Sequence, residues 1–344
     1  METILILGHV EADGLLGKPA LEALAAAKEL GGTLSVGLIG GETQRAANQV
    51  AGCGAAKFYA VSGADFIPAR YATDAAAAAA IAQAARATVV IVPHTSRWGR
   101  VVSGVAARLG GRADTHVTGI AVAGGKLSVT RWYYRQRMEA VMTRAQRPWF
   151  IAVDPGCRAP YDTGTAAAAA PAVEVVAVSL ADAQKRTQVT GLVSPSAGKQ
   201  TIRPDAALLF VAGAGWTKKQ ADGQTHIPDA EKLILGFLDQ TQASLGSSKS
   251  LVDLSGEGQA VLPFMSHLNQ IGQTGATPRH PKGLSTCCHG EEPHAVGWRF
   301  VNERRAVNLD PNCGWARGKA DVLYVADAFQ VIAKVNELLA AKKG

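Results

Sequence analysis

Residues 285–298, STCCHGEEPHAVGW, gather two adjacent cysteines, two histidines and two glutamates around Gly290. Cysteine thiolates and imidazoles are metal ligands, and a thiolate beside a histidine is a nucleophile. A glycine turn at the start of a helix can hold a phosphate on its backbone N–H groups. Three kinds of site are therefore possible here: a metal or iron–sulfur centre, a cysteine nucleophile, or a nucleotide-binding turn.

The first two kinds of site lack necessary parts. Adjacent residues of a strand point to opposite faces, so Cys287 and Cys288 are poorly placed to bind one ion, and the chain has no C-x-x-C. A cysteine nucleophile paired with His289 or His294 would need an oxyanion-stabilising group, and no motif provides one. We interpret the two cysteines as small buried hydrophobic residues at a strand end, and we assign no catalytic residue and no metal ligand. The sequence gives no role to Cys313.

The composition indicates a globular protein with two domains. The chain has 344 residues, of which 47% are hydrophobic and 18% charged. No apolar run reaches the roughly 20 residues that span a bilayer, and the start METILILGHVEADG resembles a first strand more than a signal peptide. Five cysteines are an odd number, which favours reduced thiols. We expect a cytoplasmic protein that does not bind a membrane.

The net charge of +7 raises the possibility of nucleic-acid binding. Basic and aromatic residues alternate in RWYYRQR at 131–137, at the spacing of a strand. This pattern predicts a β-hairpin with one solvated basic face, and no nucleic-acid-binding motif accompanies it. We therefore expect no nucleic-acid partner.

Strands and helices alternate in the first half of the chain. Apolar runs predict buried strands, and alanine-rich or amphipathic stretches bounded by proline and glycine predict helices. The predicted strands cover 3–8, 34–41 and 88–94, and the predicted helices cover 19–32, 74–87 and 99–111. From 119 to 153 shorter alternating segments predict antiparallel strands at the sheet edge. His94 ends a predicted strand, and we interpret it as packing or hydrogen-bonding at a domain or subunit interface.

A second α/β pattern begins after a stretch of small and turn-forming residues. We expect strands over 206–215, 250–258, 304–310 and 321–327, and helices over 231–246 and 329–343. The sequence therefore predicts an α/β protein with an N-terminal domain over 1–190 and a C-terminal domain over 200–344. Each domain would have a mostly parallel sheet. Several predicted strands end in glycine turns, which suit the approach of backbone N–H groups to a phosphate.

Several motifs together give the chain a family likeness. The first domain contains ILILGHVEADGLLGKPALEALAAAKELGG, VVIVPHTSRWGRVVSGVAARLGGRADTHVTGI and VTRWYYRQRMEAVMT. The second domain contains QIGQTG, HGEEPH, AVNLD and VAD in that order. With these motifs the chain resembles the α subunit of the electron transfer flavoproteins over nearly its whole length, as a divergent member.

This resemblance implies a fold, a cofactor and partners. The N-terminal domain would be a nucleotide-binding-like parallel-sheet domain that contacts an electron transfer flavoprotein β-type subunit. The C-terminal domain would be a flavodoxin-like domain that binds FAD. The heterodimer would shuttle electrons from a partner flavin-dependent dehydrogenase to a downstream acceptor, as a carrier and not as a catalyst with its own substrate. The resemblance also implies cofactor-binding roles for nine residues: Ile271, Gly272, Gln273, Thr274, His289, Gly290, His294, Asn308 and Asp327.

The sequence departs from the family pattern at two arginines. Ala214 stands at the place of one, and Gly256 and Glu257 stand at the place of the other and its neighbour. In STCCHGEEPHAVGW, Glu291 and Glu292 add carboxylates beside the expected phosphates, where repulsion amounts to about 1 kcal/mol per close pair in water-like surroundings and more in a dry site. We therefore interpret this stretch as a modified nucleotide turn. Four nearby cations are candidates to replace the arginines: Lys218, Lys219, Arg279 and Arg299.

A second function is compatible with these departures. The pocket could be degenerate, and the chain would then be a flavin-free structural subunit of a dehydrogenase or electron-transfer assembly. A nucleotide-binding enzyme on the same fold is a third class, but the sequence offers no group of residues for its reaction.

Overall fold

The computed structural model divides the chain into two compact units, Met1–Leu192 and Val193–Gly344. Both are mixed α/β units built on a mainly parallel sheet, as the sequence predicts. Residues 2–134, 138–164, 169–191, 203, 205–253, 261–271, 278–286, 300–313, 316–317 and 320–343 are described. Among these, no helix is long and apolar enough to cross a membrane.

The described residues of the first unit form a nine-stranded sheet in the order β7-β6-β5-β8-β4-β1-β2-β3-β9. All neighbouring pairs are parallel except β5–β6 and β6–β7. The strands are β1 (Thr3–His9), β2 (Thr33–Gly40), β3 (Lys57–Ser62), β4 (Val89–Pro93), β5 (Arg112–Ala123), β6 (Lys126–Tyr133), β7 (Met138–Met142), β8 (Trp149–Val153) and β9 (Val173–Val175).

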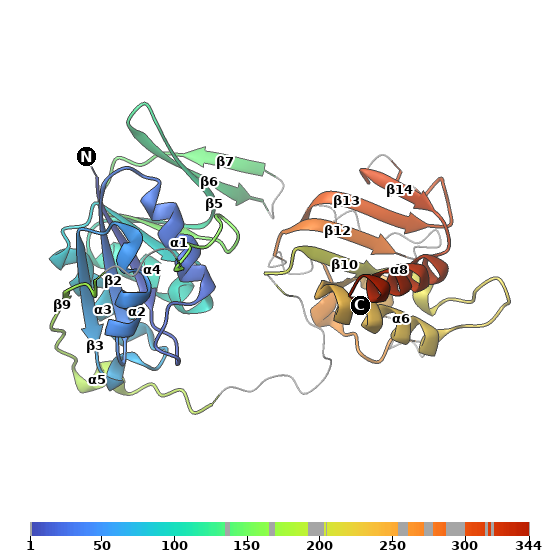
Figure 1. Ribbon diagram of the computed structural model, residues 1–344, viewed down its shortest axis with the longest axis horizontal. Helices are drawn as coiled ribbons and strands as arrows, with labels where there is room; N and C mark the ends of the chain where they lie inside the picture. The colour runs from blue at the N-terminus through green and yellow to red at the C-terminus, as the bar shows by residue number, and fades with distance from the viewer. Residues whose placement is uncertain are drawn as a thin grey trace. The chain divides into compact units, whose positions relative to one another are not determined.

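Helices cover both faces of this sheet (Figure 1). Alternate residues of β1 enter two separate cores: Ile4 and Ile6 pack in one, Leu5 and Leu7 in the other. Such two-sided burial explains why the strands are continuous apolar runs. The helical elements are α1 (Lys18–Lys28), α2 (Gln44–Gln49), η1 (Ala51–Cys53), η2 (Ala64–Phe66), α3 (Tyr71–Ala84), α4 (Ser96–Arg108) and α5 (Asp182–Lys185).

One prediction in this unit is wrong. The segment 138–153 was expected to be antiparallel and at the edge, but only β7 is; β8 lies between β4 and β5 and is parallel to both. The five residues of β8 are all buried, and a short, fully apolar run is typical of an inner parallel strand. The hairpin expected around 131–137 is that of β6 and β7, which pair antiparallel. Its basic face is only partly solvated, since Arg131 in β6 and Arg144 after β7 pair with the buried carboxylate of Asp114.

The second unit contains a five-stranded parallel sheet in the order β11-β10-β12-β13-β14 among its described residues. Numbered within the unit, this order is 2-1-3-4-5, which is that of flavodoxin-like sheets. The strands are β10 (Leu208–Ala212), β11 (Ser244–Ser247), β12 (His280–Thr286), β13 (Val301–Asn308) and β14 (Val322–Val325). The helical elements are η3 (Ala214–Thr217), α6 (Ile227–Thr241), α7 (Lys249–Asp253), η5 (His267–Asn269) and α8 (Ala328–Lys343).

The region around β11 also differs from its prediction. Helix α6 ends at Thr241 with Gln242 in the left-handed conformation, and the strand follows at once. The predicted strand at 250–258 begins instead with helix α7. β11 is only four residues long and has the sequence SLGS, too short and too poor in β-branched residues to be recognised as a strand.

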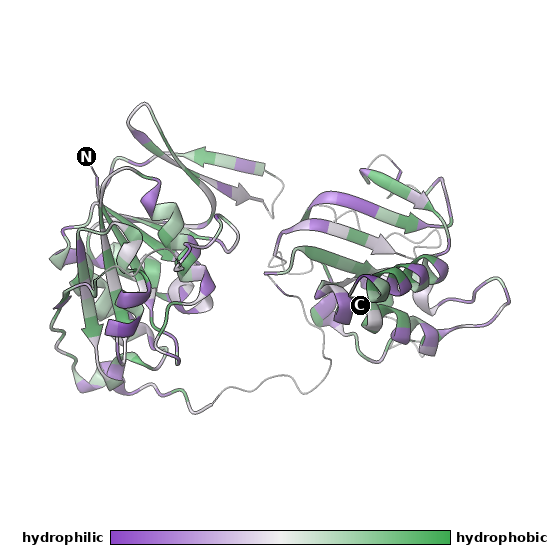
Figure 2. Ribbon diagram, viewed as in Figure 1, coloured by the Kyte–Doolittle hydropathy of each residue, from purple (hydrophilic) through white to green (hydrophobic). Residues whose placement is uncertain are grey.

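Helices α6 and α8 lie side by side over one face of this sheet (Figure 1). The core between these helices and the sheet has four central residues: Phe210, Phe237, Leu245 and Ile332. Figure 2 shows β10 as mainly hydrophobic, whereas the first half of β13 is hydrophilic. Apolar burial in this unit is therefore centred on β10, the strand from which the sheet extends in both directions.

The described cysteines are Cys53, Cys157 and Cys313, and all three are free thiols. Burial raises the pKa of the Cys53 and Cys157 thiols, which disfavours reactive thiolates. Cys287 and Cys288 lie outside the described residues.

Candidate functional site

The candidate site lies where the strands of the second unit end. The order of this sheet reverses between β10 and β12, because the chain moves from β10 outward to β11 and then returns to the other side. In open parallel sheets, ligands bind in the crevice outside the carboxyl ends of the strands at such a reversal. The residues that follow β10, β11, β12, β13 and β14 are therefore those that can contact a ligand.

The turn after β10 is tied to the end of β12. Gly213 donates its backbone N–H to the Thr286 carbonyl over 2.9 Å, and Trp216 donates its indole N–H to the Thr286 hydroxyl over 2.9 Å. Trp216 is fully buried, and its ring contacts Phe329 at the start of α8 with 4.5 Å between centroids. Ala214 is 2% exposed. The buried side chains of Ala214 and Trp216, and not a cation, therefore fill the first part of this turn.

Two buried polar atoms at the strand ends lack hydrogen-bond partners in the described part of the chain. They are the hydroxyl oxygen of Ser247, at the end of β11, and Nδ2 of Asn308, at the end of β13. The two residues are each 1% exposed. A buried polar group without a partner is unfavourable by about 1–3 kcal/mol. Such groups at strand ends fit a bound ligand that supplies the missing hydrogen bonds.

Asp327 occupies the turn between β14 and α8. Its Oδ1 accepts hydrogen bonds from the backbone N–H groups of Phe329, over 2.7 Å, and Gln330, over 3.3 Å. These contacts satisfy two free N–H groups at the start of the helix. Asp327 is thus fixed at the strand-end edge by capping α8, and it lines a cavity.

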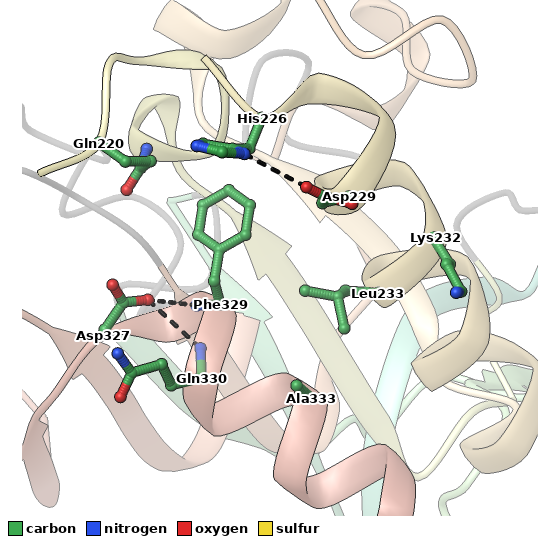
Figure 3. Close-up of a pocket in the computed structure, with 9 residues that line it drawn as sticks. All are labelled: Gln220, His226, Asp229, Lys232, Leu233, Asp327, Phe329, Gln330 and Ala333. Atoms are coloured by element: carbon green, nitrogen blue, oxygen red, sulfur yellow. Dashed lines mark hydrogen bonds and ion pairs between the residues drawn. The ribbon is translucent and has the colours of Figure 1, made fainter. Parts of the chain in front are cut away.

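This cavity has a volume of about 490 Å³ and lies between the amino-terminal turns of α6 and α8 (Figure 3). Asp327 and Phe329 form one wall, and His226 and Leu233 contribute to the other. Gln220 lies at the loop between β10 and α6. A space of this size is in the range of small-molecule sites, and its position beside two helix starts suits a ligand with negative charge.

His226 pairs with two carboxylates beside the cavity. Hydrogen bonds to Asp222, over 2.7 Å, and to Asp229, over 3.2 Å, raise the pKa of this imidazole. The protonated form is thereby favoured. Its ring lies across from Phe329, with 6.3 Å between centroids. The cavity thus combines an aromatic surface with both cationic and anionic groups.

Three of the nine predicted cofactor-binding residues are described. Asn308 and Asp327 lie at the strand-end edge, as reported above. Ile271 is 6% exposed, and its side chain packs in a small core with Leu209 and Phe300. Its backbone N–H donates to the Ser247 carbonyl over 3.1 Å, which ties Ile271 to the end of β11. Outside the described residues lie Gly272, Gln273, Thr274, His289, Gly290 and His294.

The three described candidates to replace the arginines lie at different edges of the sheet. Arg279 precedes β12 and therefore lies at the amino edge of the sheet, about 20 Å along the strand from Thr286. This position excludes it as a substitute for the family arginines. Lys218 and Lys219 follow η3 at the carboxyl edge, where a substitute is needed. Arg299, Gly256 and Glu257 lie outside the described residues.

Sequence reasoning missed Ser247 and His226. Ser247 belongs to the strand that was placed too late in the chain. His226 is the N-cap residue of α6, two residues before Pro228, so a helix-start search with proline as its marker would have placed it at the carboxyl edge.

Comparison with known families shows a match over more than half of the chain. The sequence pattern described as "Electron transfer flavoprotein domain" matches residues 4–207. The match covers nearly all of the first unit, extends into the start of the second and ends one residue before β10. No curated protein matches the chain.

Proposed function

Because the chain belongs to the electron transfer flavoprotein family, we propose that it is an α-type subunit that binds FAD in its second unit. In this role it pairs with a β-type subunit. Together they accept electrons from a flavin-dependent dehydrogenase and pass them to a downstream acceptor. The family match supports electron transfer as the general role, and the second unit supports the α-type assignment and the flavin.

The observation that carries the proposal is the edge of the second sheet. A 2-1-3-4-5 parallel sheet is the type that holds a flavin at the reversal of its strand order. At that edge Ser247 and Asn308 keep buried polar atoms without partners in the described chain. A dinucleotide supplies many hydrogen-bonding groups, so these atoms fit such a ligand.

The residues have separate tasks in this proposal. Asn308 donates a hydrogen bond, and Asp327 keeps the start of α8 in place beside the ligand. Ile271 anchors the chain directly before Gly272, Gln273 and Thr274. The family resemblance adds these three residues and His289, Gly290 and His294 to the proposed site. FAD, when bound, supplies the redox chemistry, while the chain binds it, orients it and sets its access to solvent.

The charge of the site follows from its composition. Lys218 and Lys219 are the cations after β10, whereas Ala214 replaces the expected arginine. Less fixed positive charge near the flavin destabilises its reduced, negatively charged form. We expect a lower reduction potential than in a site that keeps both arginines.

The test is co-expression of the chain with its β-type subunit, followed by an absorption spectrum before and after denaturation. The proposal predicts a yellow complex that releases FAD in a 1:1 ratio to the chain. A complex that forms but releases no flavin would contradict the cofactor and retain the family role.

One observation favours the flavin-free structural subunit instead. The turn after β10 is filled by Ala214, Gly215 and Trp216, which are all buried. A colourless heterodimer that still binds a dehydrogenase would support this second function.

A further inference from the structure

Three potential metal ligands meet in the first unit, far in sequence from the flavin motifs. Nδ1 of His94 lies 2.8 Å from Oδ1 of Asp154, and Nδ1 of His116 lies 3.4 Å from the same oxygen. The two imidazole rings are in edge-to-face contact, with 4.1 Å between centroids. One ligand atom from each residue falls within 4.8 Å of the others.

Three adjacent strands bring these residues together. β5, β8 and β4 are neighbours in the sheet, and all three run parallel. His94 directly follows β4 and Asp154 directly follows β8, so both lie at the carboxyl edge. Their position is reinforced by the backbone, since His94 donates its N–H to the Val153 carbonyl over 2.7 Å and Asp154 donates to Val117 over 2.8 Å.

His116 reaches this edge through an irregularity in β5. The pairing of β5 with β8 shifts register between Asp114 and Val117, and His116 has a φ of 56°. A bulge redirects a side chain, and the left-handed conformation is unfavourable for a residue other than glycine. The fold accepts this backbone cost and thereby turns the imidazole toward Asp154. A regular strand would have kept the two side chains apart.

We propose that His94, His116 and Asp154 bind a divalent transition-metal ion. Two imidazoles and one carboxylate are a donor set that zinc and iron(II) accept, and imidazole also favours nickel and cobalt over magnesium and calcium. Tetrahedral bonds of the usual length place ligand atoms about 3.4 Å apart, so the observed separations need only small adjustments. The site supplies three protein ligands, and a fourth position remains for water or for a donor from a partner.

The degree of burial suits this role. The side chains of His94 and Asp154 are 15% and 27% exposed, whereas that of His116 is 60% exposed. Two ligands are thus held by the protein and the third faces solvent, which gives an ion a route of entry. Gly99, in the first turn of α4, leaves room for the His94 ring, because a Cβ at that position would lie 3.3 Å from His94 Nε2.

All three ligands of this site belong to the first unit, whereas the residues of the proposed flavin site belong to the second. Its test therefore does not depend on flavin binding. The full-length chain, stripped of metal with a chelator, is titrated with Zn²⁺ against a chromophoric competitor, and with Co²⁺ while the visible spectrum is recorded. We expect one tightly bound ion per chain and no competition from excess Mg²⁺.

His116→Gly is the informative variant. Glycine accepts the left-handed backbone, so the fold is retained while one ligand is lost. The affinity for Zn²⁺ should fall by more than about 100-fold, because even residues that only support a ligand contribute 10–100-fold. Arg86→Gly is the matched control: Arg86 has a φ of 49° and gives the same backbone relief without removing a ligand. It should bind Zn²⁺ as the wild type does.

Asp154→Asn is a second variant, which keeps the size of the side chain and removes the carboxylate. It should also lose Zn²⁺ binding. The proposal is overturned if the wild type binds no ion, or if both variants retain its affinity. It is also overturned if the Co²⁺ spectrum shows a thiolate charge-transfer band, because the ion would then be bound by cysteine.

Discussion

Trp216 donates its indole N–H to the hydroxyl of Thr286, and this bond joins the turn after β10 to the end of β12 across the reversal of the strand order. Thr286 in turn donates its hydroxyl to the Val211 carbonyl over 3.2 Å. Trp216, Thr286 and the Val211 carbonyl are therefore linked by two consecutive hydrogen bonds among buried residues. The contribution of these buried residues to stability can be measured.

Trp216→Phe should lower the free energy of unfolding of the second unit by about 1–3 kcal/mol, because a buried hydrogen bond and part of the packing are lost. Denaturant unfolding measures this change. Trp98→Phe is the control, since Trp98 is 2% exposed but its indole N–H has no partner in the described chain. That substitution should have the smaller effect, and equal losses would mean that the hydrogen bond to Thr286 contributes nothing.

Ser247→Ala and Asn308→Asp test the unpaired atoms at the strand ends. Removal of the unpaired hydroxyl should leave the flavin-free chain equally stable or stabilise it by about 1 kcal/mol. Asn308→Asp keeps the acceptor for the Asp310 N–H and removes the donor, so flavin affinity should fall about tenfold or more. Fluorescence titration with FAD gives both affinities. Unchanged flavin affinity in Asn308→Asp would remove this residue from the site.

Gly110 and Gly111, which follow α4, should respond differently to alanine. Gly110 has a φ of 65° with open space around it, so Gly110→Ala should destabilise by about 1–2 kcal/mol through the backbone alone. A Cβ on Gly111 would collide with the Pro148 backbone carbonyl, which cannot move aside as a flexible side chain does. Gly111→Ala should therefore destabilise by roughly 3 kcal/mol or more. Thermal unfolding of the two variants measures both losses of stability. Similar losses would contradict the collision of the Gly111→Ala side chain with the Pro148 carbonyl.

His9 should make the first unit sensitive to mild acid. Burial lowers the pKa of this imidazole. The Asp74 carboxylate lies 3.3 Å away but does not offset the effect of burial, because Arg97 also binds that carboxylate. The folded state therefore resists protonation, whereas the unfolded chain takes up a proton near pH 6.5. The free energy of unfolding of the first unit should therefore keep its full value above that pH. Below it, the free energy of unfolding should fall by at most about 1.4 kcal/mol per pH unit.

Urea unfolding at several pH values between 8 and 5 tests this effect (roughly the range in which histidine titrates). His9→Gln should flatten the decline in the first unit. His280 offers a parallel case in the second unit, since burial lowers its pKa as well, and His280→Gln should leave the first unit unchanged. A His9→Gln chain with the wild-type pH profile would contradict the assignment.

The sequence predicted the elements that have strong local signals. Long apolar runs such as β1 and β4 and the alanine-rich α3 are evident from composition and spacing alone. β8 was misplaced because its apolar run follows directly on the hairpin segment, and only the pairing with β4 and β5 shows that it is an inner strand. β11 was missed because four small residues carry little preference of their own.

The candidate site was predictable in outline but not in detail. The family resemblance singled out Asn308 and Asp327, and both lie at the carboxyl edge of the second sheet. The burial of Trp216 depends on its fit against Thr286 and Phe329, which is a property of three elements together. The approach of His116 to Asp154 likewise depends on a bulge, which leaves no recognisable mark in the sequence.

The unpaired atoms of Ser247 and Asn308 also bear on the amount of the protein in a cell. If FAD completes their hydrogen bonds, the empty chain is the less stable form and unfolds more often. Unfolded chains are removed by proteases, so the cellular level of the subunit would follow the supply of its vitamin-derived cofactor. Growth with limiting riboflavin would then lower the amount of protein without any change in its transcript.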